Sequence, residues 1–250
     1  MPSNPENAAL PSVELSLVIP VFNEEENLPV LAAEIEEVLG TRGSVGRSYE
    51  VLWVDDGSTD SSPKVLAELA RRDSRHRTIR LSKNSGQSAA LDAGFRFARG
   101  SVVITLDADL QNDPHDIPRM LEVLDRGEGT DVVCGVRQNR QDDWVRKLSS
   151  RIANGVRNRL THESITDVGC TLRVARSEFV KDLPFFTGMH RFLPTLLRLQ
   201  GARVQEIPVH HRARLHGTAK YGIDAMVPGM VYATVMRAPV RGSGPASFNG

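Results

Sequence analysis

Residues 101–114 read SVVITLDADLQNDP, and the rest of the chain is organised around this stretch. The apolar, β-rich run from Val102 to Thr105 predicts a buried strand, and Asp107 and Asp109 follow where such a strand ends. In extended backbone, alternate side chains share a face, so both carboxylates can point at one divalent cation, with Gln111 as a neutral oxygen ligand. The alternative is a polar strand-to-helix turn in which an aspartate only caps the following helix.

The composition is that of a globular chain with balanced charge. Of its 250 residues, 40% are apolar, which is enough for the core of one large α/β domain. Lysine plus arginine and aspartate plus glutamate both number 31, so net charge gives no argument for a nucleic-acid partner. The cysteines, Cys134 and Cys170, lack the spacing of a metal site, and we expect reduced, buried thiols in a cytoplasmic protein.

The two ends of the chain are expected to lie outside the folded domain. Residues 1–13 lack the basic and then apolar character of a signal peptide and are predicted to form a disordered lead-in. No stretch of about eighteen apolar residues occurs, so the sequence predicts no transmembrane helix. The predicted domain spans residues 14–222. Residues 223–250 are predicted to be a C-terminal extension that is either cut short or peripheral to a membrane.

Strands and helices alternate along the first half. Apolar β-rich runs predict strands at 15–21, 49–54, 78–81, 102–106 and 131–136, and helical spacing predicts helices at 24–39, 62–72, 87–98 and 116–124. This rhythm predicts an α/β fold with a mostly parallel central sheet and helices on both faces. Ligands gather at the carboxyl ends of the strands in such sheets. Polar pairs follow four of the strands: Asn23 and Glu24, Asp55 and Asp56, Asn84 and Gly86, and Asp107 and Asp109.

The second half is less regular. Residues 144–160 predict a helix with an apolar stripe among basic residues, which fits either an anionic membrane surface or an ordinary solvated face. Strands are predicted at 167–174 and 203–211, and a short helix at 192–199. His210 and His211 are adjacent in a strand and point to opposite faces, so we expect no zinc site there.

The loop DDGSTD, at residues 55–60, is a second polar cluster. Its carboxylates and hydroxyls can bind a nucleobase or ribose while Gly57 lets the backbone approach closely; the alternative is a tight turn with a helix cap. Together with DADLQ it implies a nucleoside diphosphate held by a metal. The sequence has no glycine-rich phosphate loop, so cations must neutralise the pyrophosphate, and Arg212, Arg214 and Lys220 are the candidates unless they belong to a solvated loop.

The order of several motifs resembles a known family. VIPVFNEEENLP, VDDGSTD, KNSGQSAAL, DADLQNDP, DVGC and RLHGTAKYG follow one another between Leu15 and Gly222. This succession resembles the family 2 glycosyltransferases of GT-A fold, and more narrowly the polyprenyl-phosphate glycosyltransferases, such as dolichyl-phosphate mannosyltransferase. The resemblance implies inverting transfer of a hexose from a GDP-mannose or UDP-glucose type of donor to dolichyl or undecaprenyl phosphate. It also implies Mg²⁺ or Mn²⁺ as cofactor and a peripheral position at the cytoplasmic face of the membrane.

The resemblance implies roles for individual residues. Those expected to contact the donor are Pro20, Phe22, Glu24, Asp55, Asp56 and Asp107. Asp109 and Gln111 are expected to hold the metal, and Arg214 and Lys220 to close over the pyrophosphate, although Ala219 replaces the serine usual in that motif. The expected catalytic set is Asp107, Asp109, Arg214 and Lys220. The residues expected to take the acceptor phosphate are Arg137, Arg146, Ser150 and Arg191, with Asp167, Gly169 and Cys170 shaping the site from beneath.

Charge sets the expected mechanism. A departing nucleoside diphosphate builds negative charge that a metal and two cations stabilise. A lipid phosphate is largely ionised at neutral pH and needs no strong general base, whereas a sugar hydroxyl needs one, with Asp107 and Asp167 as candidates. The alternatives are a family 2 glycosyltransferase acting on a saccharide or other hydroxyl, and an inactive nucleotide-binding subunit.

Overall fold

A seven-stranded sheet forms the centre of the molecule. The computed structural model describes residues 13–40, 43, 45–126, 129–137, 167 and 169–213. The strands are β1 (Leu15–Val21), β2 (Tyr49–Asp55), β3 (His76–Arg80), β4 (Val102–Thr105), β5 (Val132–Arg137), β6 (Arg173–Arg176) and β7 (Val204–Val209). Their order is β3-β2-β1-β4-β6-β5-β7. Because only β6 runs antiparallel to its neighbours, β4 and β5, the predicted mostly parallel sheet is confirmed.

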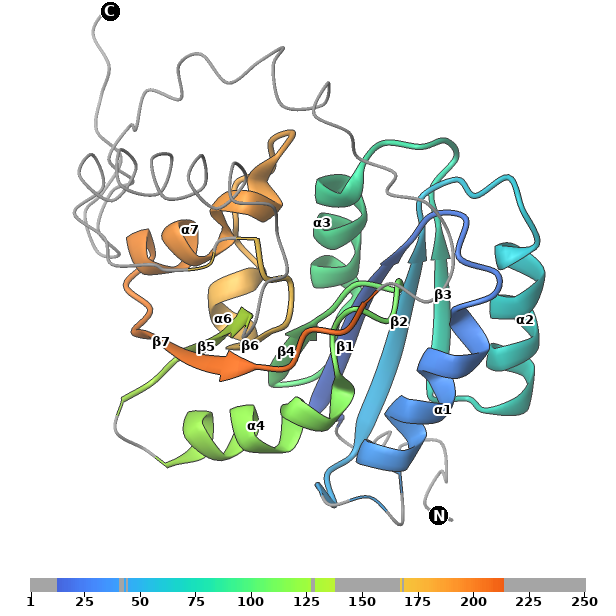
Figure 1. Cartoon of the computed structure of the whole chain (residues 1–250). Helices are drawn as coiled ribbons and strands as arrows, with labels where there is room; N and C mark the ends of the chain where they lie inside the picture. The colour runs from blue at the N-terminus through green and yellow to red at the C-terminus, as the bar shows by residue number, and fades with distance from the viewer. Residues whose placement is uncertain are drawn as a thin grey trace, which may run out of the picture.

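Helices cover both faces of this sheet (Figure 1). The α-helices are α1 (Leu28–Leu39), α2 (Ser62–Arg72), α3 (Gln87–Phe97), α4 (Ile117–Asp125), α6 (Ser177–Val180) and α7 (Leu193–Leu199), and the 3₁₀ helices are η2 (Pro114–Asp116) and η3 (Met189–Phe192). On β1, Leu17 and Ile19 pack in one hydrophobic cluster with α1, α2 and α4. Val18 faces the opposite cluster with α3, α6 and α7. The alternation of side chains along a strand thus builds two cores on one sheet.

Two predicted elements differ clearly from the structure, and a third falls outside the described residues. The helix predicted at 24–39 begins at Leu28, because the carbonyl of Glu24 accepts the N–H of Asn27 in a turn before it. The strand predicted at 167–174 is limited to β6, and the short helix α6 after it was missed. The helix predicted at 144–160 lies outside the described residues.

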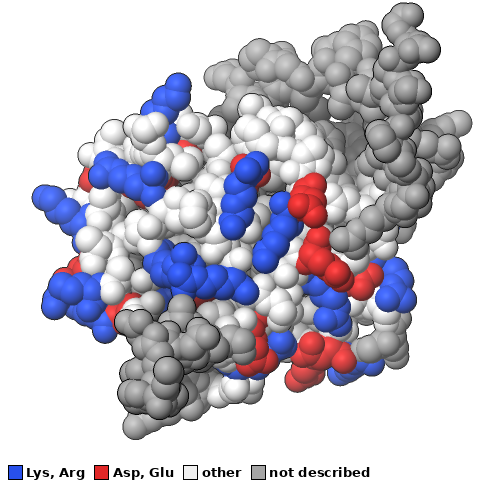
Figure 2. All heavy atoms as spheres, turned by 180° about the vertical axis from the view of Figure 1, so that it is seen from behind, with Lys and Arg blue, Asp and Glu red and all other residues white. Residues whose placement is uncertain are grey.

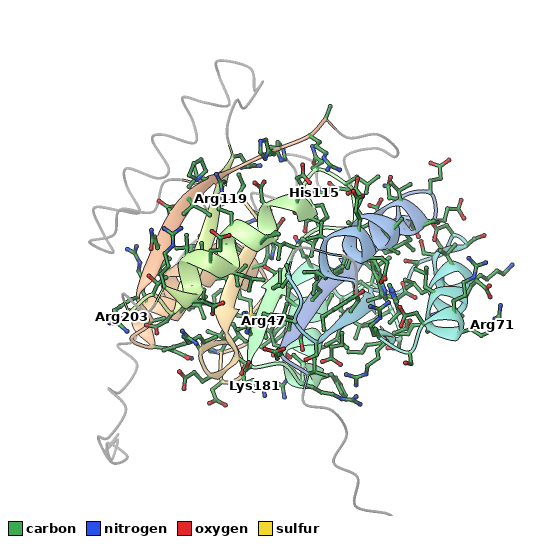
Figure 3. All side chains as sticks on the ribbon, turned by 90° about the horizontal axis from the view of Figure 1, so that it is seen from below. Arg47, Arg71, His115, Arg119, Lys181 and Arg203 are labelled. Atoms are coloured by element: carbon green, nitrogen blue, oxygen red, sulfur yellow. The ribbon has the colours of Figure 1, made fainter. Side chains whose placement is uncertain are left out.

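The surface carries both basic and acidic side chains, and some of them form ion pairs. Arg47 pairs with Glu14 at 3.2 Å and with Asp125 at 3.0 Å, which joins the chain before β2 to the end of α4. Arg71 and Arg203 lie at opposite sides of the molecule (Figure 3). Basic and acidic side chains are interspersed on the face shown in Figure 2. In the part of the chain that the structure describes, no helix has the length and apolarity needed to cross a membrane.

Candidate functional site

A pocket opens at the carboxyl edge of the sheet, where β1, β2 and β4 end side by side (Figure 1). The end of β1, the loops after the three strands and the first residue of α3 form its walls, which enclose about 180 Å³. The lining residues are Pro20, Val21, Phe22, Glu24, Asp56, Gln87, Asp107, Ala108, Asp109 and Gln111. The structure therefore brings together most of the residues that were assigned to the donor and to the metal.

The DADLQ turn places Asp109 and Gln111 in a compact loop. The N–H of Gln111 donates to Asp109 Oδ1 at 3.1 Å. Between them Leu110 has a φ of 62°, in the left-handed region, and its side chain is completely buried. A residue with a Cβ is disfavoured there by roughly 1–2 kcal/mol. Packing of the Leu110 side chain in the core stabilises this strained turn.

Asp107 sits in the pocket between two side-chain donors. Gln87 Nε2 donates to Asp107 Oδ1 at 2.7 Å, and Thr171 Oγ1 donates to Asp107 Oδ2 at 2.8 Å. Burial, followed by repulsion from the carboxylate of Asp109, raises the pKa of Asp107 to about 6, although the Thr171 hydrogen bond and the positive charge of Arg173 act against this. Two carboxylates that repel each other therefore line the pocket side by side.

This donor set fits a hard divalent cation. Carboxylate and amide oxygens suit Mg²⁺ or Mn²⁺, and Mg²⁺ is commonly bound by one or two carboxylates plus substrate phosphates. The described residues contain no cluster of three or more acidic, histidine or cysteine side chains arranged around a metal position. Asp109 and Gln111 thus fit a cation shared with a bound diphosphate. A cation there would also relieve the repulsion between the carboxylates of Asp107 and Asp109.

The two aspartates at the end of β2 lie in different environments. Asp55 is fully buried and accepts the N–H of Ser58 at 2.8 Å, so it shapes the turn below the pocket. Asp56 lines the pocket and accepts the N–H groups of Ser85 at 2.7 Å and Gly86 at 2.8 Å. Burial raises the pKa of Asp56, and these backbone hydrogen bonds oppose the rise. Of the pair, Asp56 is the one placed to meet a ligand.

Gly57 allows a close approach within the chain. Its φ is 72°, and a Cβ at this position would lie 2.6 Å from the carbonyl carbon of Lys83 and 2.7 Å from the nitrogen of Asn84. From the sequence, we expected Gly57 to let the backbone come close to a bound ligand. In the structure, the loop after β3 occupies that space, which explains the glycine without a ligand.

The loop after β1 is tied to the loop after β2. The N–H of Asn23 donates to Ser58 Oγ at 2.9 Å, and that of Glu24 donates to Ser62 Oγ at 2.8 Å. Asn23, which has a positive φ of 56°, accepts the N–H of Thr59 at 2.8 Å through its side chain. Ser58 and Thr59 of DDGSTD, together with Ser62, therefore hold the pocket wall that carries Phe22 and Glu24.

The DVGC motif builds a support for Arg137 at the end of β5. Asp167 accepts two hydrogen bonds from the Arg137 guanidinium, both at 2.8 Å, in a mostly buried pair. A Cβ on Gly169 would lie 2.6 Å from Arg137 Nη2, so a larger residue there would have to displace the guanidinium. Cys170 is buried, as predicted. Asp167 thus orients Arg137, which agrees with a shaping role for the motif.

The other residues assigned to the acceptor are only partly described. Arg191 lies in η3, which packs against the first turn of α3. There Ser88 Oγ accepts the N–H of Gly188 at 3.0 Å and lies 2.8 Å from His190 Nδ1. Arg191 does not belong to the residues that line the pocket. Arg146 and Ser150 lie outside the described residues, so their acceptor role stays a prediction.

Arg212 has a different role from the one predicted. Its guanidinium contacts Glu34 of α1 and Asp113, each at 2.6 Å, and its N–H donates to the carbonyl of Gln111 at 2.9 Å. These contacts bind the chain after β7 to the DADLQ turn, so Arg212 is an anchor and not a cation directed at a pyrophosphate. Arg214 and Lys220, assigned to that task, lie outside the described residues.

Sequence reasoning missed Gln87, Asn112 and Thr171. Asn112 Oδ1 accepts the N–H of Asp107 at 3.0 Å and lies 2.8 Å from Thr171 Oγ1. The position of Gln87 at the start of a helix that follows a strand was a usable signal, because such residues lie at the carboxyl edge. No comparable signal pointed to Thr171.

Comparison with known proteins identifies the family. The description "Glycosyl transferase family 2" matches residues 16–183. The chain belongs to glycosyl transferase family 2. It is 43% identical over 214 residues to the undecaprenyl-phosphate 4-deoxy-4-formamido-L-arabinose transferase of Edwardsiella ictaluri (strain 93-146). The aligned region is 85% of this chain and 64% of that relative, so this family 2 chain spans less than two thirds of the relative's length.

Solved structures show the same fold. Glucosyl-3-phosphoglycerate synthase from Mycobacterium tuberculosis, in complex with Mn²⁺ and UDP-glucose, matches with a TM-score of 0.63 and 21% identity over 86% of this chain and 74% of that one. Its complex with Mg²⁺ and UDP matches with a TM-score of 0.63 and 20% identity over the same shares. Identity this low supports the fold alone. The predicted GT-A fold of this family 2 chain is confirmed.

Proposed function

We propose that this family 2 chain is a glycosyltransferase that moves a sugar from a nucleotide-diphosphate donor to undecaprenyl phosphate or a related polyprenyl phosphate. One observation carries the proposal: Asp56, Asp107, Asp109 and Gln111 line a single pocket in a chain 43% identical to an enzyme named for undecaprenyl-phosphate transfer. The pocket supports donor binding, and the relative supports the lipid acceptor.

The donor's nucleoside is assigned to the part of the pocket near β1 and β2. Pro20 and Phe22 supply apolar wall, and Asp56 supplies an acceptor for donor hydroxyl or base N–H groups. Asp56 is held by the N–H groups of Ser85 and Gly86, so its carboxylate has a fixed direction. A fixed acceptor loses little entropy when a ligand binds, which favours recognition.

The diphosphate is assigned to the Asp109 side of the pocket. Asp109 and Gln111 would hold Mg²⁺ or Mn²⁺, which supplies positive charge where the leaving nucleoside diphosphate becomes negative. Asp107, fixed beside them, accepts hydroxyl groups of the sugar or ribose. Arg214 and Lys220, close in sequence to the anchor at Arg212, are the proposed cations over the pyrophosphate.

The acceptor is assigned to Arg137, Arg146, Ser150 and Arg191. A phosphate monoester with a second pKa near 6 is largely ionised at neutral pH, so it attacks without a strong base. Attack from the face opposite the leaving group inverts the anomeric centre. The Asp167 pair fixes the fork geometry of Arg137, which suits planar recognition of phosphate oxygens.

A lipid acceptor implies contact with a membrane. We propose a peripheral position at the cytoplasmic face, with residues 144–160 as the basic segment nearest anionic lipid. Flotation with vesicles that contain anionic lipid tests this. The chain should float with the vesicles at low salt and stay at the bottom when vesicles are neutral.

A second candidate is transfer to a hydroxyl acceptor. The pKa of Asp107, raised to about 6, is near the range of a general base at neutral pH, which a hydroxyl nucleophile needs and a phosphate does not. The two candidates share the donor pocket. They differ in which acceptor receives the sugar.

The deciding experiment incubates the chain with labelled GDP- and UDP-sugars, Mg²⁺ or Mn²⁺, and undecaprenyl or dolichyl phosphate. Label in the organic phase from one donor, lost on chelation, is the expected result. Metal-dependent donor hydrolysis without lipid label would move the acceptor to a hydroxyl compound. Neither transfer nor hydrolysis would favour an inactive nucleotide-binding subunit and contradict the proposal.

A further inference from the structure

Three side chains from separate segments surround Asp107. Gln87, at the start of α3, donates to Oδ1 at 2.7 Å, and Thr171, just before β6, donates to Oδ2 at 2.8 Å. Asn112 Oδ1 accepts the backbone N–H of Asp107 at 3.0 Å and lies 2.8 Å from the same Thr171 hydroxyl. We call Gln87, Asn112 and Thr171 the Asp107 frame.

The frame opposes a local repulsion. Asp109 follows two residues later and lines the same pocket, and two nearby carboxylates repel each other. Without donors on both oxygens, the carboxylate of Asp107 would be free to rotate about its side-chain bonds. Since each carboxylate oxygen can accept more than one hydrogen bond, the frame leaves Asp107, which lines the pocket, with acceptor capacity for a ligand.

Thr171 is itself held in place. Thr105 Oγ1, at the end of β4, donates to the carbonyl of Thr171 at 2.6 Å. The hydroxyl of Thr171 has one hydrogen, and an ionised carboxylate attracts it more strongly than the amide oxygen of Asn112 does. The hydroxyl is therefore directed at Asp107 by its backbone position and by charge.

We propose that Thr171 and Gln87 are positioning residues that fix the plane of the Asp107 carboxylate toward the donor's hydroxyl groups. The inference rests on the proposed function, because it assigns these side chains to the same donor pocket. Nothing in the motifs points to Thr171, which stands between DVGC and β6.

The test compares Thr171→Val, which keeps the shape without the hydroxyl, with Thr171→Ser, which keeps the hydroxyl. Loss of a hydrogen bond to a charged group should lower kcat/KM for sugar transfer about tenfold or more in Thr171→Val. Thr171→Ser should recover most of this loss, and Gln87→Met should resemble Thr171→Val. Thr195→Val, which removes a buried hydroxyl that does not line the pocket, should keep its activity within about twofold.

A double-mutant cycle separates positioning from general damage. If Thr171 acts through Asp107, Thr171→Val should cause no further loss of kcat/KM in an Asp107→Asn background. The hydrogen bond from Thr171 to the carboxylate is already changed in that background. Full activity of Thr171→Val, or a loss that adds fully to that of Asp107→Asn, would overturn the proposal.

Crystal structures give a readout that is independent of activity. In Thr171→Val the Asp107 carboxylate should rotate away from its wild-type plane, and in Thr171→Ser it should stay. An unrotated carboxylate in Thr171→Val would overturn the frame even if the wild-type chain transferred sugar. The two proposals can also fail separately in the other direction. If the wild-type chain transferred sugar from no donor, the proposed function would be contradicted. A rotated carboxylate in Thr171→Val would still support the frame.

Discussion

Charged residues at this pocket divide between those that meet a ligand and those that hold the loops. Asp56 and Asp109 line the pocket, whereas Asp55 accepts a backbone N–H beneath it. Arg212 looked like a cation for the pyrophosphate, yet it spans Glu34 and Asp113. Residues of the same type therefore take different roles, and the hydrogen-bond and ion-pair partners of each side chain decide which role it has.

Asp109→Asn should abolish transfer and leave the fold intact. The amide keeps the acceptor for the Gln111 N–H, seen at 3.1 Å, but loses the negative charge that the cation needs. We expect a fall of about 10²–10³-fold or more in kcat, with a melting temperature close to that of the wild type.

Its matched control is Asp92→Asn, at a partly exposed position of α3, where the aspartate pairs with the exposed Arg96 at 2.9 Å. That variant should retain activity within about twofold, since an exposed ion pair within one helix contributes little. Full activity in Asp109→Asn, measured with saturating metal, would refute the metal assignment.

At the level of elements, the apolar runs were sufficient to place β1, β2, β4 and β5 to within a residue or two, and α2 was predicted with its observed bounds. Periodicity did not show that Glu24 to Asn27 form a turn, because these four residues are all polar and glutamate is itself a good helix former. Nor did it show the left-handed φ of Leu110, since leucine is not a residue that predicts such a turn.

Because of the left-handed turn at Leu110, we expect the glycine variant at this position to be more stable than the alanine variant. Leu110→Ala should destabilise the chain by about 2–5 kcal/mol, because a buried side chain is lost while the strained φ remains. Leu110→Gly loses the same packing but relieves the strain, so it should be about 1 kcal/mol more stable than Leu110→Ala. Urea unfolding of both variants measures the difference.

Leu121, buried in α4, is the control for this comparison. There the order should reverse, with Leu121→Gly about 1 kcal/mol less stable than Leu121→Ala, because glycine is unfavourable inside a helix. If glycine were also the less stable replacement at position 110, the left-handed turn would not be the source of strain.

Across the whole molecule, the direction of one strand explains why part of the site escaped the sequence. Parallel strands bring their ends to the carboxyl edge, so residues after β1, β2 and β4 were found. β6 runs the other way, pairing Arg173 with Thr105 and Arg176 with Val102, so it brings its beginning to that edge. Thr171 therefore precedes its strand. A search limited to residues that follow a strand misses Thr171, and the sequence does not show in which direction a strand runs.

The packing of η3 on α3 should make stability depend on pH. Burial, with the nearby charges of Arg191 and Arg173, lowers the pKa of His190 to about 4 from 6.5. Between these values the unfolded chain binds more protons, so stability rises with pH and is lost as pH falls. From pH 7.5 to pH 5 the His190 contribution should fall by about 2 kcal/mol.

His190→Asn provides the comparison, because its amide oxygen can accept from Ser88 and does not titrate. Urea unfolding at both pH values gives the free energy of unfolding of each chain. The wild type should lose about 2 kcal/mol more than the variant on acidification, since the other titrating groups cancel. Equal losses would show that His190 titrates normally in the folded chain.

Ligand binding at the carboxyl edge should stabilise the whole sheet, because the pocket joins three strand ends that separate on unfolding. A nucleoside diphosphate with Mn²⁺ at about a hundred times its Kd should add about 2.7 kcal/mol to the free energy of unfolding. For a chain of this size that raises Tm by roughly 5–10 °C. The shift, followed by thermal unfolding, should vanish with chelator and in Asp109→Asn. An equal shift without metal, or in that variant, would show that the diphosphate binds independently of a cation at Asp109.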